Sequence, residues 1–138
     1  MPMRLEIVTG ERVVYSGDVD AVVAPGIEGE LGILPHHAAL MTMLQPGELR
    51  VTKDGQDVLM AVSGGFMEVL PHKVTILADT AERAEEIDEA RAEEARKRAQ
   101  KILAEGAAAE IDIARAQAAM RRAIVRLKVA QKKKRRGL

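Results

Sequence analysis

The change of composition between Ala78 and Asp79 limits what this chain of 138 residues can fold into more than any other feature. Up to Ala78 the chain holds five Lys or Arg against ten Asp or Glu, a net charge of −5. From Asp79 onward the counts are sixteen and eleven, a net charge of +5, so the formal charge of zero conceals two different halves. This length accommodates one full domain, or a small domain with an appendage. We expect two domains, residues 1–78 and 79–138.

Turn signals recur every eight to twelve residues in the first half, which is typical of an all-β sandwich or barrel. Met3–Ile7 alternates apolar and polar residues, as a half-buried strand does. A second strand is expected over Asp18–Ala24, closed by Pro25-Gly26, and Asp54-Gly55 predicts a tight hairpin. Strands this short need two facing sheets to bury their apolar sides. Further strands are expected at Leu49–Thr52, Val58–Val62, Phe66–Leu70 and Val74–Ala78.

The second half reads as two antiparallel helices joined at Gly106. Asp79 is expected to cap the first helix, with Glu82 as its capping-box partner three residues on. Apolar residues of the second helix follow heptad-like spacing. That seam comprises Ala109, Ile113, Ala116, Met120, Ala123, Leu127 and Ala130, and its facing seam Ala92, Ala95, Ala99 and Ile102. Alanine buries only about 0.8 kcal/mol per methyl-sized group. The hairpin is therefore either a marginally packed device that folds back or swings open, or a plain dimerisation arm.

Each predicted helix opens with the same six-residue phrase, Ile87–Ala92 in the first and Ile111–Ala116 in the second. Asp and Arg three residues apart lie on one helix face, so each copy is expected to form an internal ion pair. Such a pair is either a surface salt bridge contributing at most ~0.5 kcal/mol or part of a charged patch that binds a polar ligand. Both interpretations remain open at this point.

Catalytic chemistry finds little support in the residues. The chain has no cysteine, so it has no disulfide framework and no thiolate site, which suits a reducing compartment. His36 and His37 are adjacent and His72 stands apart, so none has the spacing of a helical zinc pair. We therefore expect no catalytic residue, no metal site and no required cofactor. No apolar run approaches the ~18 residues of a membrane span, so a soluble chain is expected.

The basic run Lys132–Arg136 could release counterions from nucleic-acid phosphates. However, the only aromatic residues are Tyr15 and Phe66, so the helical half has none to stack on bases. A solvated helix end that complements the helix dipole is the simpler interpretation. We expect no nucleic-acid partner.

Gly29–His37, together with Val62–Val69 and Val74–Ala78, resembles the epsilon subunit of bacterial F-type ATP synthases. The similarity covers nearly the whole chain, including the Glu82–Glu85 stretch. It implies a ten-stranded β sandwich followed by a C-terminal antiparallel two-helix hairpin. It also implies a non-catalytic rotor subunit of the central stalk, peripheral on the cytoplasmic side of the cell membrane.

The resemblance further implies the partners of each domain. The β domain would bind the gamma subunit and the c-ring, with Glu30 and His37 at the c-ring contact. His36 occupies a position where glycine is frequent in the family. The helices would lie compactly against the sandwich or extend into the catalytic head and inhibit ATP hydrolysis. The basic second helix would then meet an acidic segment of the catalytic beta subunits.

In some bacterial members of that family the compact form binds ATP through the pattern Ile/Leu-Asp-x-x-Arg-Ala. Ile87, Asp88, Arg91 and Ala92 match its fixed positions. The resemblance assigns ATP the role of a possible regulatory ligand and leaves the copy at Ile111–Ala116 unused. The remaining residues of the implied site are Glu82, Arg98, Arg122 and Arg126.

Overall fold

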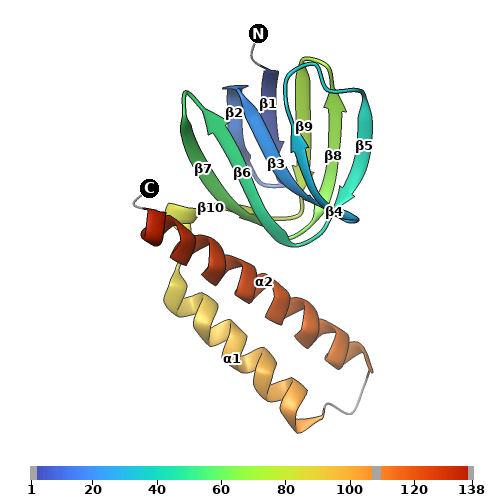
Figure 1. Ribbon diagram of the computed structural model, residues 1–138. Helices are drawn as coiled ribbons and strands as arrows, with labels where there is room; N and C mark the ends of the chain where they lie inside the picture. The colour runs from blue at the N-terminus through green and yellow to red at the C-terminus, as the bar shows by residue number, and fades with distance from the viewer. Residues whose placement is uncertain (1–2, 107–109, 137–138) are drawn as a thin grey trace.

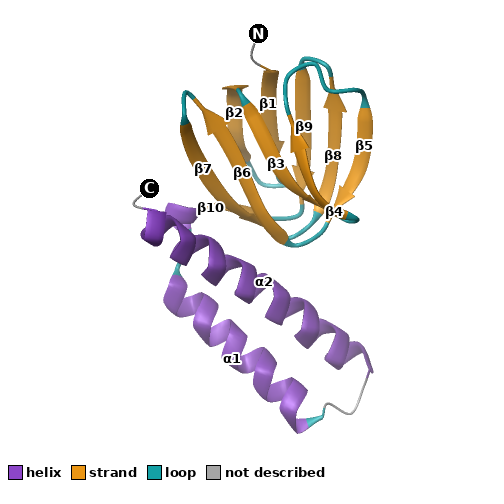
Figure 2. Ribbon diagram, viewed as in Figure 1, coloured by secondary structure: helices purple, strands orange, loops and turns teal. Residues whose placement is uncertain are grey.

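The computed structural model describes residues 3–106 and 110–136, and within them ten strands precede two long helices (Figures 1 and 2). The strands are β1 (Met3–Val8), β2 (Val13–Val19), β3 (Ala21–Gly26), β4 (Gly29–Ile33), β5 (Leu40–Leu44), β6 (Gly47–Lys53), β7 (Gln56–Val62), β8 (Gly65–Leu70), β9 (Lys73–Ala78) and β10 (Ala81–Arg83). A short 3-10 turn, η1 (Ala84–Glu86), leads into α1 (Glu89–Glu105) and α2 (Glu110–Arg136).

The strands wrap into two layers around one core. One layer has the order β5-β8-β9-β1-β2, and the other has the order β10-β7-β6-β3 with β4 paired to β3. The two meet at a single pairing, Gly26 with Leu44. All pairings are antiparallel except that of β1 with β9. The predicted ten-stranded β sandwich is confirmed.

Alternation along the strands explains how the core is filled. On β1, Met3, Leu5 and Ile7 are buried while the residues between them face outward. β7 differs, because its last four residues are all buried. Met60 and Val62 join the sandwich core, whereas Leu59 and Ala61 belong to a second cluster. A strand buried on both faces reads as a continuous apolar run, and β7 has one because α2 covers its outer face.

The hairpin predicted at Asp54-Gly55 is confirmed. Both residues have positive φ angles, 52° and 76°, as a type I′ turn between β6 and β7 requires. The single strand expected over Asp18–Ala24 is wrong, because Asp20 divides it. The Asp20 N–H donates to the carbonyl oxygen of Thr52 at 2.8 Å, and its carboxylate accepts from the Asp54 N–H at 2.8 Å. The chain passes there from the layer of β1 to the layer of β6.

The predicted start of the helical half is also wrong. Asp79 caps no helix; its N–H donates to the carbonyl oxygen of Gly64 at 3.0 Å. Residues 81–83 instead form β10, which pairs with the edge of β7, so the sheet continues past the predicted boundary between Ala78 and Asp79. The free edge of β7 outweighs the local capping pattern, because it satisfies backbone groups that a helix start would leave unpaired. Asp88 caps α1, and its Oδ1 accepts from the Arg91 N–H at 3.1 Å.

The two helices form the expected antiparallel hairpin, with α2 lying between α1 and the sandwich (Figure 1). Of the predicted seam, Ala92, Ala99, Ala116, Ala123 and Ala130 are buried, and Ala109 lies outside the described residues. Ile102 faces α2 as predicted but is 43% exposed, because it lines a cavity between the helices. α2 docks on the sandwich through Val129, which is buried against Leu59, Ala61 and Ala84, with Ile87 and Val125 packed around it.

Candidate functional site

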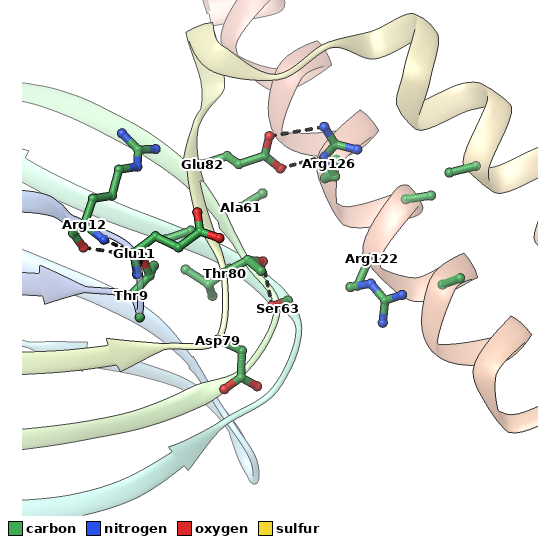
Figure 3. Close-up of a pocket in the computed structure, with 16 residues that line it drawn as sticks. Thr9, Glu11, Arg12, Ala61, Ser63, Asp79, Thr80, Glu82, Arg122 and Arg126 are labelled. Carbon is green, nitrogen blue, oxygen red and sulfur yellow. Dashed lines mark hydrogen bonds and ion pairs between the residues drawn. The ribbon is translucent and has the colours of Figure 1, made fainter. Parts of the chain in front are cut away.

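A cavity of about 610 Å³ lies between the sandwich and the hairpin; we call it the interdomain cavity (Figure 3). The turn between β1 and β2, the segment from β9 to β10, and both helices contribute to its wall. It combines charges of both signs, so a ligand there would meet carboxylates as well as guanidinium groups. Its charged lining residues are Glu11, Arg12, Asp79, Glu82, Arg122 and Arg126.

An ion pair between Glu82 of β10 and Arg126 of α2 closes one side of the interdomain cavity. Nε of Arg126 lies 2.7 Å from Oε1 of Glu82, and Nη2 donates to Oε2 at 3.1 Å. The Nε–H is buried but not directed at Oε1, so charge attraction and the Nη2 hydrogen bond hold the pair. Both side chains are partly buried, so water screens the pair less than it would on an open surface.

The C-terminal half of α2 is attached to the rest of the chain by three consecutive lysines. Lys132 donates to both oxygens of Glu48 on β6, at 2.8 and 3.0 Å. Lys133 lies 3.2 Å from Glu85 of η1, and Lys134 lies 2.9 Å from Glu89 at the start of α1. These pairs give the lysines of the basic run a structural role, because each lysine contacts a carboxylate of the same chain.

The pKa of Glu85 lies below its ordinary value. Burial alone would raise the pKa of this carboxyl group, but a backbone hydrogen bond and the hydrogen bond and charge of Lys133 outweigh burial. On α1, Arg96 likewise hydrogen-bonds to Glu93 and lowers the pKa of that carboxyl group.

A second cavity, of about 820 Å³, lies between α1 and α2; we call it the interhelical cavity. Alanines and Ile102 form its apolar wall. Arg98 comes from α1, and Arg115 and Arg122 come from α2, with Asp112 beside them. The side chains of these three arginines form no hydrogen bond or ion pair with any residue of the described ranges.

The structure divides the predicted ATP-binding residues among different places. Glu82, Arg122 and Arg126 line the interdomain cavity, and Arg98 and Arg122 line the interhelical cavity. Arg122 is common to both. The others lie apart from these cavities: Ile87 packs beside Val129, Asp88 caps α1, Arg91 is exposed and Ala92 is buried on α1.

The internal ion pair predicted for each phrase is wrong. Within residues 3–106 and 110–136, no ion pair joins Asp88 to Arg91 or Asp112 to Arg115. In the first copy the carboxylate of Asp88 instead accepts from the backbone N–H of Arg91, because the phrase straddles the helix start. Asp112 and Arg115 line the interhelical cavity without having been predicted there, although the repeated phrase was the available signal.

Glu30 is the second residue of β4, which pairs with β3 alone among the described strands. Glu30 is exposed near the β3–β4 turn, whereas His37 lies in the loop beyond the other end of β4. Nδ1 of His37 lies 2.7 Å from the carbonyl oxygen of Ala38. The two predicted c-ring residues therefore lie apart: Glu30 is on the open edge strand, and His37 is in the loop past the end of that strand.

His36 adopts a φ of 68°, which explains why glycine suits this position. Its N–H donates to the carbonyl oxygen of Pro71 at 2.8 Å, and its ring meets the edge of His72 with centroids 5.0 Å apart. These contacts join the loop after β4 to the β8–β9 turn. They offset the cost of a left-handed conformation at a residue with a side chain.

An exposed apolar row, which the sequence analysis did not identify, crosses the outer face of one layer. Met43, Phe66 and Leu77 are neighbours on β5, β8 and β9, and Leu77 continues to Val8 and Val13 on β1 and β2. Four of these five side chains are between 49% and 61% exposed. The hairpin packs against β7 in the other layer and leaves the row uncovered.

Within the described ranges, no three His, Asp or Glu side chains gather as potential metal ligands. Neither helix, over the residues the structure describes, is long and apolar enough to cross a membrane.

Both parts of the fold match known protein families. The beta-sandwich domain of the ATP synthase delta/epsilon chain matches residues 2–84, and the long alpha-helix domain of the same chain matches residues 85–131. The protein is thus a sandwich-plus-hairpin subunit: the chain belongs to the ATP synthase delta/epsilon family. Within that family it groups with the bacterial epsilon chains, as its resemblance predicted.

Curated relatives support this grouping over the full length. The epsilon chain of Herpetosiphon aurantiacus is 59% identical over 136 residues, covering 99% of both chains. That of Dehalococcoides mccartyi is 56% identical over 133 residues, covering 96% of this chain and 95% of its own. That of Chloroflexus aurantiacus is 68% identical over 96 residues, covering 70% and 69%.

Solved structures with the same fold come from rotary assemblies. A chain in the OSCP/F1/c-ring structure of the Euglena gracilis mitochondrial ATP synthase superposes with a TM-score of 0.78 at 25% identity, covering 87% of this chain and 76% of that one. A chain of the Tetrahymena thermophila mitochondrial central stalk and c-ring has a TM-score of 0.64 at 15% identity, covering 94% and 97%, and shows the shared fold alone.

Proposed function

We propose that this chain is the non-catalytic epsilon subunit of the central rotor in a proton-translocating F-type ATP synthase. It couples the c-ring to the catalytic head through its sandwich and restrains ATP hydrolysis through its helices. The subunit would be peripheral, on the cytoplasmic side of the cell membrane. One observation carries the proposal: the chain combines an apolar sheet face that the hairpin leaves uncovered with a basic helix, α2, that ion pairs hold in place.

The apolar row from Met43 to Val13 is the proposed docking face for the gamma subunit. A contiguous exposed apolar surface favours a protein partner, because covering it removes apolar area from water at about 25 cal/mol per Å². The F1/c-ring assembly that contains the structural neighbour at 25% identity supports a rotor subunit as that partner. Glu30 on the open edge strand β4 and His37 in the loop beyond it are the proposed contacts with the polar loops of the c-ring.

The hairpin is the proposed inhibitory element. In the folded form, carboxylates of the same chain form ion pairs with Arg126 and with Lys132 to Lys134. If α2 swings away, these cations become free for the acidic segment of a catalytic beta subunit. Each of these pairs is in partial contact with water and contributes only about 1 kcal/mol, so one set of carboxylates can replace the other at little net cost.

ATP is the proposed regulatory ligand of the folded hairpin; no cofactor is otherwise required. Of the residues implied by resemblance, Glu82, Arg98, Arg122 and Arg126 line the two cavities, and Arg122 lines both. Arginine suits a phosphate ligand because its planar fork donates two hydrogen bonds at once. At a hundred times its dissociation constant, a ligand stabilises the state it binds by about 2.7 kcal/mol.

Truncation tests the proposal directly. A chain ending after Ile87 keeps all ten strands and η1 but lacks both helices. Reassembled with the other subunits, it should still couple rotation to proton transport, while ATP hydrolysis rises above that of the full chain. Unchanged hydrolysis would remove the inhibitory role. Loss of assembly by Phe66→Ser, with the sandwich still folded, would support the gamma docking face, and normal assembly would argue against it.

A further inference from the structure

The strands β10 and β2 stand at the two ends of the strand order, and each pairs with one neighbour among the described strands. An open edge presents backbone groups that need partners. Side chains, rather than a ladder of backbone hydrogen bonds, connect these two edges. The residues that take part are Arg12, Val14, Tyr15, Arg83 and Glu86.

A β-bulge in β2 accounts for the first of these contacts. Val13 and Tyr15 each have a partner on β1, but Val14 between them has none. The extra residue of a bulge is left out of the ladder, and Val14 is buried, so its carbonyl oxygen needs another donor. Nη2 of Arg83 on β10 donates to that oxygen at 2.9 Å. Arg83 therefore satisfies a backbone group of the opposite edge.

Two further contacts reinforce this hydrogen bond. The guanidinium carbon of Arg83 lies 5.6 Å from the centroid of the Tyr15 ring, within the range of a cation–π interaction. Glu86 of η1 accepts from the Arg83 N–H at 3.2 Å and from Nη2 of Arg12, in the β1–β2 turn, at 3.1 Å. The segment from β10 to η1 is thus bound to β2 and its preceding turn by contacts in which neither helix takes part.

The same segment contacts α2 through different side chains. Glu82 and Glu85 form ion pairs with cations of α2, whereas Arg83 and Glu86 contact β2 and the turn before it. α1 packs mainly on α2 and so moves with it. Undocking of the hairpin therefore breaks the first set of contacts and leaves the second set in place.

We propose that Arg83 and Glu86 form a latch that keeps β10 and η1 on the sandwich when the hairpin undocks, so that the chain turns at Ile87 and Asp88. These last two residues have extended backbone between η1 and α1, so no helical turn resists rotation there. The proposal rests on the proposed opening of the hairpin and fixes its pivot. The carboxylates that receive α2 thereby remain on the sandwich and can form its ion pairs again.

Hydrogen exchange of the full-length chain, read at the β10 and α2 amides, tests the latch. Arg83→Met removes the guanidinium group, so β10 exchange should accelerate about tenfold or more, the loss of a hydrogen bond from a charged donor. Exchange of α2 should stay within about twofold, because its own contacts are intact. Equal acceleration of β10 and α2 would mean that they open together, and it would overturn the latch, as would unchanged exchange at β10.

Arg50→Met is the matched control. Arg50 lies on β6, two strands from β10, and forms no hydrogen bond or ion pair with the part of the chain that the structure describes. This substitution removes the same charged group, so it should change β10 exchange by less than about twofold. An effect as large as that of Arg83→Met would show that net charge, and no latch, controls β10.

Tyr15 provides a second readout, because the chain has one tyrosine and no tryptophan. Val129→Asp places an unpaired carboxylate in the buried contact of α2, so the α2 amides should exchange freely. Quenching of Tyr15 fluorescence by acrylamide, and protection of β10, should stay as in the unsubstituted chain. Both should change when Arg83→Met is added. If Val129→Asp alone exposes Tyr15 and β10, the linker leaves with the hairpin and the latch is overturned.

Hydrolysis by the reassembled enzyme separates the latch from the inhibitory role on which it rests. The truncated chain reports inhibition, whereas exchange at β10 reports the latch. Loss of the latch with inhibition retained would leave the proposed function standing and move the pivot to a point before β10. If α2 stays protected in Val129→Asp, the comparison of Arg83→Met with Arg50→Met decides alone.

Discussion

Arg126 of α2 and Glu82 of β10 are joined by a contact of 2.7 Å between Nε and Oε1, across the cavity that separates hairpin and sandwich. β10 is the strand that sequence reasoning placed inside a helix. Its pairing with β7 sets Glu82 beside α2, so the closure of the interdomain cavity depends on that strand.

The Glu82–Arg126 pair should stabilise docking of α2 measurably. In a double-mutant cycle of Glu82→Gln and Arg126→Met, we expect a coupling energy of about 1 kcal/mol, near the upper limit for exposed pairs because both side chains are partly buried. Hydrogen exchange of the α2 amides gives the docking free energy. Additive effects of the two substitutions would mean that the pair contributes nothing to docking.

Apolar packing should hold α2 as firmly as any ion pair. Val129→Ala removes two buried methyl groups from the contact with Leu59 and Ala61, so docking should weaken by about 1.5 kcal/mol. Exchange should accelerate in α2 while the sandwich strands keep their protection. Ile124→Ala is the control, because Ile124 is 41% exposed and lies outside this cluster, and equal effects of the two variants would refute the assigned contact.

Gly65 should tolerate no side chain. Its φ of 131° is outside the range that other residues adopt, and a Cβ would overlap the carbonyl oxygen of Leu77. Gly65→Ala should lower the free energy of unfolding by about 3 kcal/mol or more, measured by thermal denaturation. Gly10→Ala, which meets open space at an ordinary φ, should change it by less than about 0.5 kcal/mol.

Acid should loosen the hairpin through Glu85. Its pKa is lower in the folded chain than in the unfolded chain, where a glutamate titrates near 4.3. The pair with Lys133 therefore stabilises docking above about pH 4.3, and this contribution is lost as the pH falls through the lower folded value. The pH profile of α2 exchange should flatten in Glu85→Gln but not in Glu94→Gln, whose carboxylate has no ion-pair partner among the described residues. Identical profiles in both variants would contradict this.

Several parts of the fold followed from short-range patterns. The alternation at Met3–Ile7, the Asp54-Gly55 turn and the alanine seam of the hairpin all depend on residues within one turn or one strand of each other. Those patterns predicted the sandwich, the tight hairpin and the helical half correctly. The capping pattern at Asp79 and Glu82 was equally local, yet it failed because a distant strand edge competed for the same backbone groups.

The sequence by itself determined that a β domain precedes two helices and that the chain has an acidic and a basic half. Only the tertiary structure decided which charges meet, because a pair such as Lys132 and Glu48 spans 84 residues and forms only after α2 docks on the sandwich. The packing of α1 against α2 likewise decides that Arg115 lines the interhelical cavity and that Arg91 lines none of the cavities described, although both arginines stand in the same phrase and both are exposed. The repeated phrase places the same side chains on both helices. Their electrostatic environment differs, because it depends on the surfaces that pack around each helix.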